Sequence, residues 1–129
     1  MKVVPLLGRI LFSIIFLYSA PGDFSHGTAA YAAGAGVPLA SIAVPIAGIL
    51  AILGSLSILL GYKAKIGAWL IVLFLVPVTL TMHRFWTVSD PMMHMMQQIN
   101  FLKNTAMLGG ALMIAYFGAG PLSIDSSAK

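Results

Sequence analysis

Residues 39–61 of the chain, LASIAVPIAGILAILGSLSILLG, contain no charged side chain. A transmembrane helix needs about 20 apolar residues to cross about 30 Å of hydrocarbon, and this stretch is long enough. Three further apolar runs lie at residues 3–20, 66–82 and 99–117. All four runs are too long for the strands of a membrane barrel, so the sequence predicts four transmembrane helices.

The composition supports a membrane protein. Of the 129 residues, 60% are hydrophobic and 8% are charged, whereas soluble domains average about 45–50% apolar and about 25% charged residues. A soluble monomer and a disordered chain are both excluded. The net charge of +4 comes from bases scattered between apolar runs, so we predict no nucleic-acid binding. We predict one all-α domain over residues 1–129, a polytopic membrane protein folded as a four-helix transmembrane bundle in the lipid bilayer.

The first span has two features that need interpretation. Tyr18-Ser19-Ala20 is similar to a signal-peptide cleavage site, but we predict that the span is retained, because Arg9 divides its apolar run and Pro21 would begin the cleaved chain. Arg9 itself is interpreted as an anchor whose side chain reaches the headgroups, with a buried site as the alternative. Residues 21–38 carry Phe24, Thr28 and Tyr31 at helical spacing, which predicts a short interfacial helix.

The positions of lysine and arginine predict the orientation, because these residues are enriched in cytoplasmic loops. With four spans, one side of the membrane carries Lys2, Arg9, Lys63, Lys65 and Lys129. The opposite side carries Arg84 and Lys103 together with Asp23 and Asp90. We therefore predict that both termini are cytoplasmic, in a bacterial inner membrane.

A cluster of polar residues begins the fourth span. Asn100, Lys103 and Asn104 are spaced to share one helix face, and polar groups inside a bilayer are candidate functional sites. The predicted topology brings the end of the first span and the end of the third span to the same level. We predict a ligand-binding vestibule there, or alternatively a structural network in which Lys103 pairs with Asp23. The predicted binding residues are Asn100, Lys103, Asn104, His83, Trp86, Tyr18 and Asp23.

Metal binding and catalysis receive little support from the sequence. The chain has no cysteine, and residues 92–96 (MMHMM) place His94 away from the methionines on a helix, so a Cu(I) site is a minor alternative. Haem ligation by His83 and His94 is another minor alternative. We predict no metal site, and no self-contained catalytic motif is found.

Small residues predict how the helices pack, because membrane helices associate through close contacts of such residues. Ala43, Ala47, Ala51 and Ser55 form a ladder along one face of the second span. The ladder predicts helix packing within the chain or, alternatively, the docking of a partner helix. Pro45 and Pro77 predict bends in their spans, or the opening of a cavity.

Several short motifs resemble the DoxX family of small four-helix membrane proteins. They are GRI at residues 8–10, FLYSA at 16–20, LLGYK at 59–63, MHRFW at 82–86, NFLKN at 100–104 and FGAGPLSID at 117–125. The resemblance implies association with membrane oxidoreductases.

From the vestibule and this resemblance we predict a subunit or a quinone-binding or small-ligand-binding partner of an oxidoreductase, with quinone as its possible cofactor. The alternative is a non-catalytic assembly protein that acts through helix–helix contacts, with a partner subunit or a second copy of the chain. Whether the chain is an enzyme stays open at this point.

Overall fold

The computed structural model describes residues 1–127, and in this range the chain forms helices and no strand. The helices are α1 (Val3–Ser19), η1 (Ala20–Phe24), α2 (His26–Gly34), α3 (Ala40–Leu60), α4 (Ala64–Met82), η2 (Phe85–Thr87), α5 (Pro91–Phe117) and α6 (Ile124–Ser127). The all-α prediction is confirmed. The short helix predicted after the first span is present as α2, whose N-cap Ser25 accepts a hydrogen bond from the Thr28 N–H at 3.1 Å.

Three stretches are long and apolar enough to cross a membrane: Val3–Phe24, Ala40–Leu60 and Ala64–Thr87. These candidates agree closely with the first three predicted spans, and within residues 1–127 no fourth stretch qualifies. Helix α5 is longer than the predicted span, because it begins at Pro91 rather than at residue 99. Asp90 caps this earlier start by accepting the Met93 N–H at 2.9 Å, and proline suits the first helical position.

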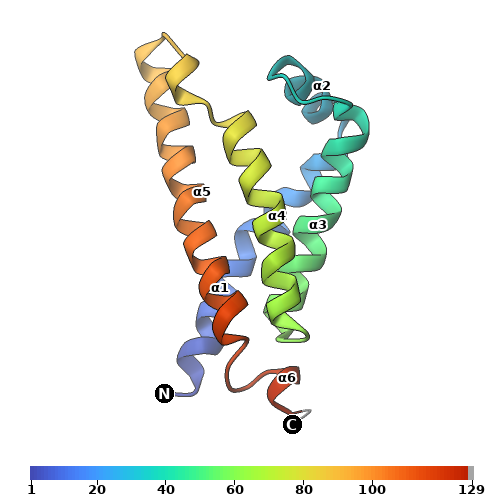
Figure 1. Cartoon of the computed structure of the whole chain (residues 1–129), viewed down its shortest axis with the longest axis vertical. Coiled ribbons are helices and arrows are strands. Elements are labelled where there is room, and N and C mark those ends of the chain that lie inside the picture. Colours follow the sequence, from blue (N-terminus) through green and yellow to red (C-terminus); the bar gives the residue numbers. More distant parts are fainter. Residues whose placement is uncertain (128–129) are drawn as a thin grey trace.

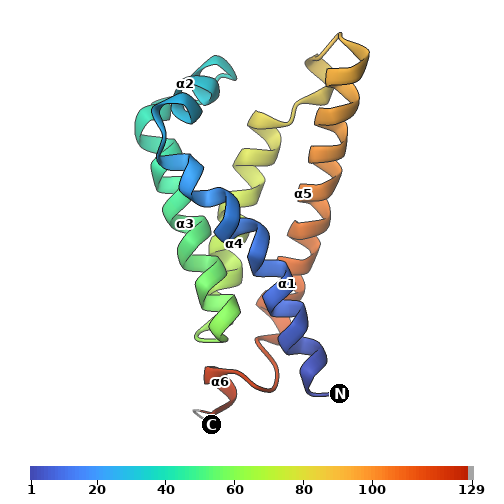
Figure 2. The ribbon, with the colours of Figure 1, turned by 180° about the vertical axis from the view of Figure 1, so that it is seen from behind.

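Helices α3, α4 and α5 lie side by side, with α4 in the middle. Helix α1 crosses behind them in Figure 1 and in front of them in Figure 2. The N-terminus, the α3–α4 turn and α6 lie at one end of the molecule, which we call the α6 end. Helix α2 and the beginning of α5 lie at the opposite end, the α2 end. Lys129, which contributed to the orientation prediction, lies outside the described residues.

Glycines allow α3 and α4 to approach closely at their crossing. A Cβ atom added to Gly54 would lie 2.8 Å from the Gly67 carbonyl oxygen, and one added to Gly67 would lie 2.4 Å from the Ser57 hydroxyl oxygen. Ala51 and Ser55 of the predicted ladder are buried here against the rest of the chain. The ladder therefore packs helices within the molecule, and Ala51 and Ser55 are not available to a partner helix.

Arg9 ties three segments together at the α6 end. Its side chain is 3% exposed, and its guanidinium donates to the carbonyl oxygens of Ile58 and Leu59 at the end of α3 and of Pro121 and Leu122. The anchor interpretation is therefore wrong, and the alternative of a buried site holds. The reason is that the last carbonyls of a helix have no partner within that helix and provide acceptors for a buried cation.

Candidate functional site

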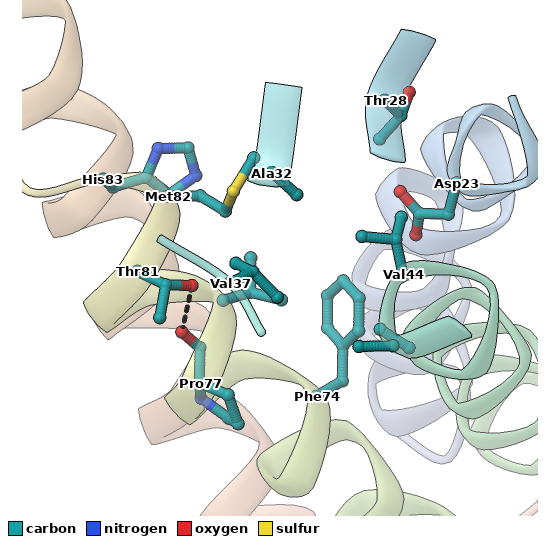
Figure 3. Close-up of a pocket in the computed structure, with 13 residues that line it drawn as sticks. Asp23, Thr28, Ala32, Val37, Val44, Phe74, Pro77, Thr81, Met82 and His83 are labelled. Atoms are coloured by element: carbon teal, nitrogen blue, oxygen red, sulfur yellow. Dashed lines mark hydrogen bonds between the residues drawn. The ribbon is translucent and has the colours of Figure 1, made fainter. Parts of the chain in front are cut away.

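A cavity of about 240 Å³ opens at the α2 end between η1, α2, α3 and α4 (Figure 3). Most of its wall is apolar, and four lining side chains carry polar atoms. The lining residues are Asp23, Thr28, Ala32, Val37, Ala43, Val44, Ala47, Phe74, Pro77, Val78, Thr81, Met82 and His83.

Local sequence explains why space remains there. Ala43 and Ala47 present only methyl groups from α3. On the α4 side, Pro77 has no N–H to donate within its helix, and the Thr81 hydroxyl donates to the Pro77 carbonyl oxygen at 2.7 Å. Gly48 allows η1 to lie close against α3, since a Cβ atom there would be 2.9 Å from the Asp23 Cβ. Proline and small residues thus shape the cavity.

Three of the four polar side chains in the wall already have hydrogen-bond partners. Thr28 donates to the Gly22 carbonyl oxygen at 2.8 Å, and Thr81 is bound to Pro77. The His83 Nδ1 lies 2.8 Å from the Gln97 Oε1. The half-buried Asp23 carboxylate has no hydrogen bond or ion pair with any residue in the range 1–127. Asp23 is therefore the one lining group with unused hydrogen-bonding capacity in the described part of the chain.

Hydrogen bonds hold α2 over the side of the cavity. Gln97 of α5 accepts a hydrogen bond from the His83 Nδ1 through its Oε1, and its Nε2 donates to the Tyr31 Oη of α2 at 3.4 Å. Arg84 donates to the Ala35 carbonyl oxygen at the end of α2 and to the Thr81 carbonyl oxygen. A second hollow of about 330 Å³ adjoins this point and shares Thr81 and Met82 with the cavity. Hydrogen bonds thus fix α2 to both α4 and α5.

The structure brings together only part of the predicted binding set. Asp23 and His83 line the cavity. Tyr18 is 87% exposed and Trp86 is 53% exposed. Trp86 instead belongs to an aromatic cluster, with ring centroids 5.2 Å from Phe85 and 5.8 Å from Phe101.

The polar cluster of α5 is also divided. Asn104 is buried, Asn100 is partly buried and Lys103 is exposed. No ion pair joins Lys103 to Asp23, so the predicted pairing is wrong. The reason lies in the order of the helices: α5 packs on α4, whereas η1 packs on α3 on the other side (Figure 1).

His94 and the methionines of the methionine–histidine segment have different surroundings. His94 turns toward the protein, with its Nδ1 3.1 Å from the Val88 carbonyl oxygen and its ring 5.4 Å from that of Phe85. Met92, Met95 and Met96 are exposed. Residues 1–127 contain no group of three or more His, Cys, Asp or Glu side chains placed to hold a metal, and no cofactor, quinone included, is indicated.

The sequence analysis did not identify the residues that hold α2 in place. Gln97 and Arg84 bind across α2, α4 and α5, at sequence separations of 14 to 66 residues. No spacing pattern connects positions so far apart. Thr28 contributed to the sequence analysis only through its helical spacing with Phe24 and Tyr31. No feature of the sequence indicated a role for Thr81.

The SURF4 family model matches residues 37–129, more than half of the chain. This chain belongs to the SURF4 family. The prediction of a DoxX protein is therefore wrong. It rested on short motifs that are individually weak, whereas the SURF4 match runs continuously from α3 to α6.

Two relatives support a membrane protein. Inner membrane protein YphA of Escherichia coli is 28% identical over 125 residues, covering 95% of this chain and 89% of YphA. ER-derived vesicles protein ERV29 of Saccharomyces cerevisiae is 28% identical over 81 residues, covering 63% of this chain and 26% of ERV29. The SURF4-family chain thus spans about a quarter of ERV29 but most of YphA. No solved structure is significantly similar to it.

Proposed function

We propose that this SURF4-family chain is a non-catalytic membrane protein that binds a small amphiphilic ligand in the cavity at the α2 end. The ligand has an apolar body and an ammonium or other hydrogen-bond donor. The Asp23 carboxylate carries the proposal, because it lines a mostly apolar cavity and has no hydrogen-bond or ion-pair partner within residues 1–127.

The chemistry of the wall supports this ligand class. A carboxylate held away from water without a partner is costly, and a donor on the ligand would satisfy it. The cavity of about 240 Å³ lies just below the range of about 300–1,000 Å³ of drug-sized pockets, so it suits a short alkyl group or a single side chain. Of the predicted binding residues, we retain Asp23 and His83 as ligand contacts.

We propose α5 as a fourth span. The N-terminus and α6 lie at the same end of the molecule (Figure 1), which requires an even number of crossings. Helix α5 has 27 residues, enough for about 40 Å at 1.5 Å per residue. Lys103 is exposed and only two residues along α5 from Phe101, which packs on Phe85 just beyond α4. The ammonium can then reach the headgroups at that boundary.

We also propose that the α6 end faces the cytoplasm of a bacterial inner membrane. Lys2, Lys63 and Lys65 lie at this end, which agrees with the positive-inside rule. YphA is named as an inner membrane protein, and it matches nearly the whole chain. The expected oxidoreductase partner rested on the DoxX resemblance, so we do not propose it.

The ligand class can be tested with three probes that share one alkyl chain: hexylammonium, hexanol and hexanoate. Calorimetric titration of the full chain in lipid nanodiscs, with empty nanodiscs as the blank, should give the tightest binding for hexylammonium. A charge-assisted hydrogen bond contributes about 1.5–3 kcal/mol, so Asp23→Asn should weaken hexylammonium binding by about 10-fold to 150-fold. Hexanol binding should change little.

Two variants complete the test. Asp90→Asn removes the same charge at the α2 end but outside the cavity, since Asp90 caps α5, and should leave all three affinities unchanged. Ala47→Leu fills the cavity and should weaken all three probes. Equal effects of Asp23→Asn and Asp90→Asn, or equal affinity for hexylammonium and hexanoate, would refute the proposal.

A second candidate function is assembly with another copy of the chain through lateral helix contacts. One observation favours it: the first turns of α5 rise beyond the end of α4 (Figure 1) and expose Met92, Met95 and Met96. Replacing all three by Gln should lower energy transfer between donor-labelled and acceptor-labelled copies reconstituted together. Unchanged transfer, or no transfer in the unmodified protein, would count against assembly.

A further inference from the structure

A third open space, separate from the ligand cavity and from the hollow that adjoins it, lies at the α6 end. It has a volume of about 560 Å³ and is formed by the first turn of α4, the end of α5 and α6. We call it the lysine hollow. Its lining residues are Lys63, Ala64, Lys65, Ile66, Phe117, Gly118, Ala119, Gly120, Asp125 and Ser126.

The two lysines of this hollow carry positive charges that no acidic group in residues 1–127 neutralises. The nearby Asp125 is turned to the main chain, because its Oδ1 accepts the Lys63 N–H at 2.7 Å and its Oδ2 accepts the Ala64 N–H at 3.0 Å. Neither Lys63 nor Lys65 forms an ion pair with it. The hollow therefore holds two free ammonium groups beside one carboxylate whose oxygens are both engaged.

Each of the two lysine side chains also makes a contact with the protein. The Lys63 Nζ lies 5.6 Å from the centroid of the Tyr62 ring, a cation–π contact. The stem of Lys65 passes over Gly118, where an added Cβ atom would be 3.3 Å from the Lys65 Cε. This close passage is possible because Gly118 has no side chain. The stem of Lys65 thus packs on the protein while its charge stays accessible.

The hollow lies at the boundary between hydrocarbon and headgroups in the proposed membrane frame. Helix α3 ends at Leu60, α4 begins at Ala64 and α5 ends at Phe117. Ile66 and Phe117 are 61% and 70% exposed and flank the hollow on the side of the spans. Basic pockets between transmembrane helices at this level suit anionic headgroups.

We propose that the lysine hollow binds the phosphate group of an anionic phospholipid, which Lys63 and Lys65 contact, with an acyl chain along Ile66 and Phe117. This site is independent of the ligand cavity at the α2 end. The interaction is a charge-assisted hydrogen bond from two ammonium groups to phosphate oxygens. A free phosphate ion offers the same oxygens but no acyl chain.

Native mass spectrometry of the full chain released from nanodiscs can count retained lipids. The probe nanodiscs contain phosphatidylcholine alone or mixed with phosphatidylglycerol. The unmodified protein should retain one phosphatidylglycerol molecule selectively. Each lysine near an anionic surface contributes about fivefold to binding, so the double variant Lys63→Gln, Lys65→Gln should retain this lipid about thirtyfold less well.

A matched control removes two charges elsewhere. Lys2→Gln with Lys103→Gln leaves the hollow intact and should retain phosphatidylglycerol like the unmodified protein. Circular dichroism should show that both double variants fold, because all four side chains are exposed. Equal loss in the two double variants would overturn the proposal. So would binding of inorganic phosphate, measured by titration, that matches the lipid in affinity, because the acyl chain would then contribute nothing.

Discussion

Replacing Arg9 by Met tests whether the buried guanidinium holds the α6 end together. Methionine keeps an unbranched apolar stem and removes the four hydrogen bonds to the carbonyl oxygens of Ile58, Leu59, Pro121 and Leu122. These bonds connect α1 to the end of α3 and to the segment before α6. We therefore expect loss of stability together with release of the C-terminal segment.

The expected magnitude follows from the geometry. The distances to Ile58 and Pro121, 3.3 Å and 3.4 Å, exceed the usual range for N–H···O bonds, whereas those to Leu122 and Leu59, 2.6 Å and 3.1 Å, do not. Hydrogen bonds to a charged group contribute about 1.5–3 kcal/mol each, so these two give about 3–6 kcal/mol. Removing the cation also removes the cost of burying it, and its Nε atom has no partner among the described residues. We expect a net loss of about 3 kcal/mol in the free energy of unfolding.

The assay is unfolding of the detergent-solubilised protein by sodium dodecyl sulfate, followed by far-ultraviolet circular dichroism. Lys103→Met is the matched control, because it removes one charge from an exposed side chain of another helix and should change the free energy by less than about 0.5 kcal/mol. Arg9→Lys should not restore stability, since a single ammonium lacks the planar fork that reaches two segments. If Arg9→Met lost less than about 1 kcal/mol, the assignment of Arg9 as a structural clasp would be refuted.

Three further substitutions can be measured in the same unfolding assay. Gly61→Ala should destabilise the protein, because Gly61 has φ +67° and an added Cβ would lie 2.2 Å from the Ser123 Cβ; its effect should be less than additive with Arg9→Met, and full additivity would contradict a shared clasp. Gly67→Ala should lower the free energy of unfolding by about 1–3 kcal/mol, because it overpacks the α3–α4 crossing. Gly109→Ala, with no atom within 4 Å of the added Cβ, should raise it by about 0.5–1 kcal/mol. The reverse order of stabilities would refute the close α3–α4 crossing. Asp125→Ala should lose about 0.5–2 kcal/mol, as for other caps of a helix N-terminus, and a neutral result would mean that the Lys63 and Ala64 amides need no acceptor.

Hydropathy and spacing predicted the helices well because both depend on properties local to the chain. The uncharged run at residues 39–61 gave α3 (Ala40–Leu60), and the sequence itself marked the start of α5 with Asp90 followed by Pro91. The prediction still placed the fourth span at residue 99, because hydropathy measures what fits in hydrocarbon and not where hydrogen bonding begins. The part of a helix that fits in hydrocarbon can be shorter than the whole helix, and α5 is the helix in which the two lengths differ.

The site was predicted only in part because it depends on which helices are neighbours. Asp23 and His83 both line the cavity, as their predicted level required. Asn100, Lys103 and Asn104 share a level with them, but α4 separates α5 from η1 (Figure 1). A topology of alternating spans gives depth in the membrane and does not give the lateral order of helices. That order comes from close contacts such as Gly54 with Gly67, whose pairing no spacing rule reveals.

The three polar side chains that drew attention in the sequence are distinguished by what surrounds them. Polar groups in or near a bilayer are functional candidates by default, yet Arg9 is bound to four carbonyl oxygens and so serves the fold. Lys103 is exposed near the end of α4, where headgroups can neutralise it. Asp23 alone of the three faces an apolar cavity without a partner. Its carboxylate has no hydrogen bond to another residue in the range 1–127, and that capacity for a hydrogen bond is the feature a ligand can use.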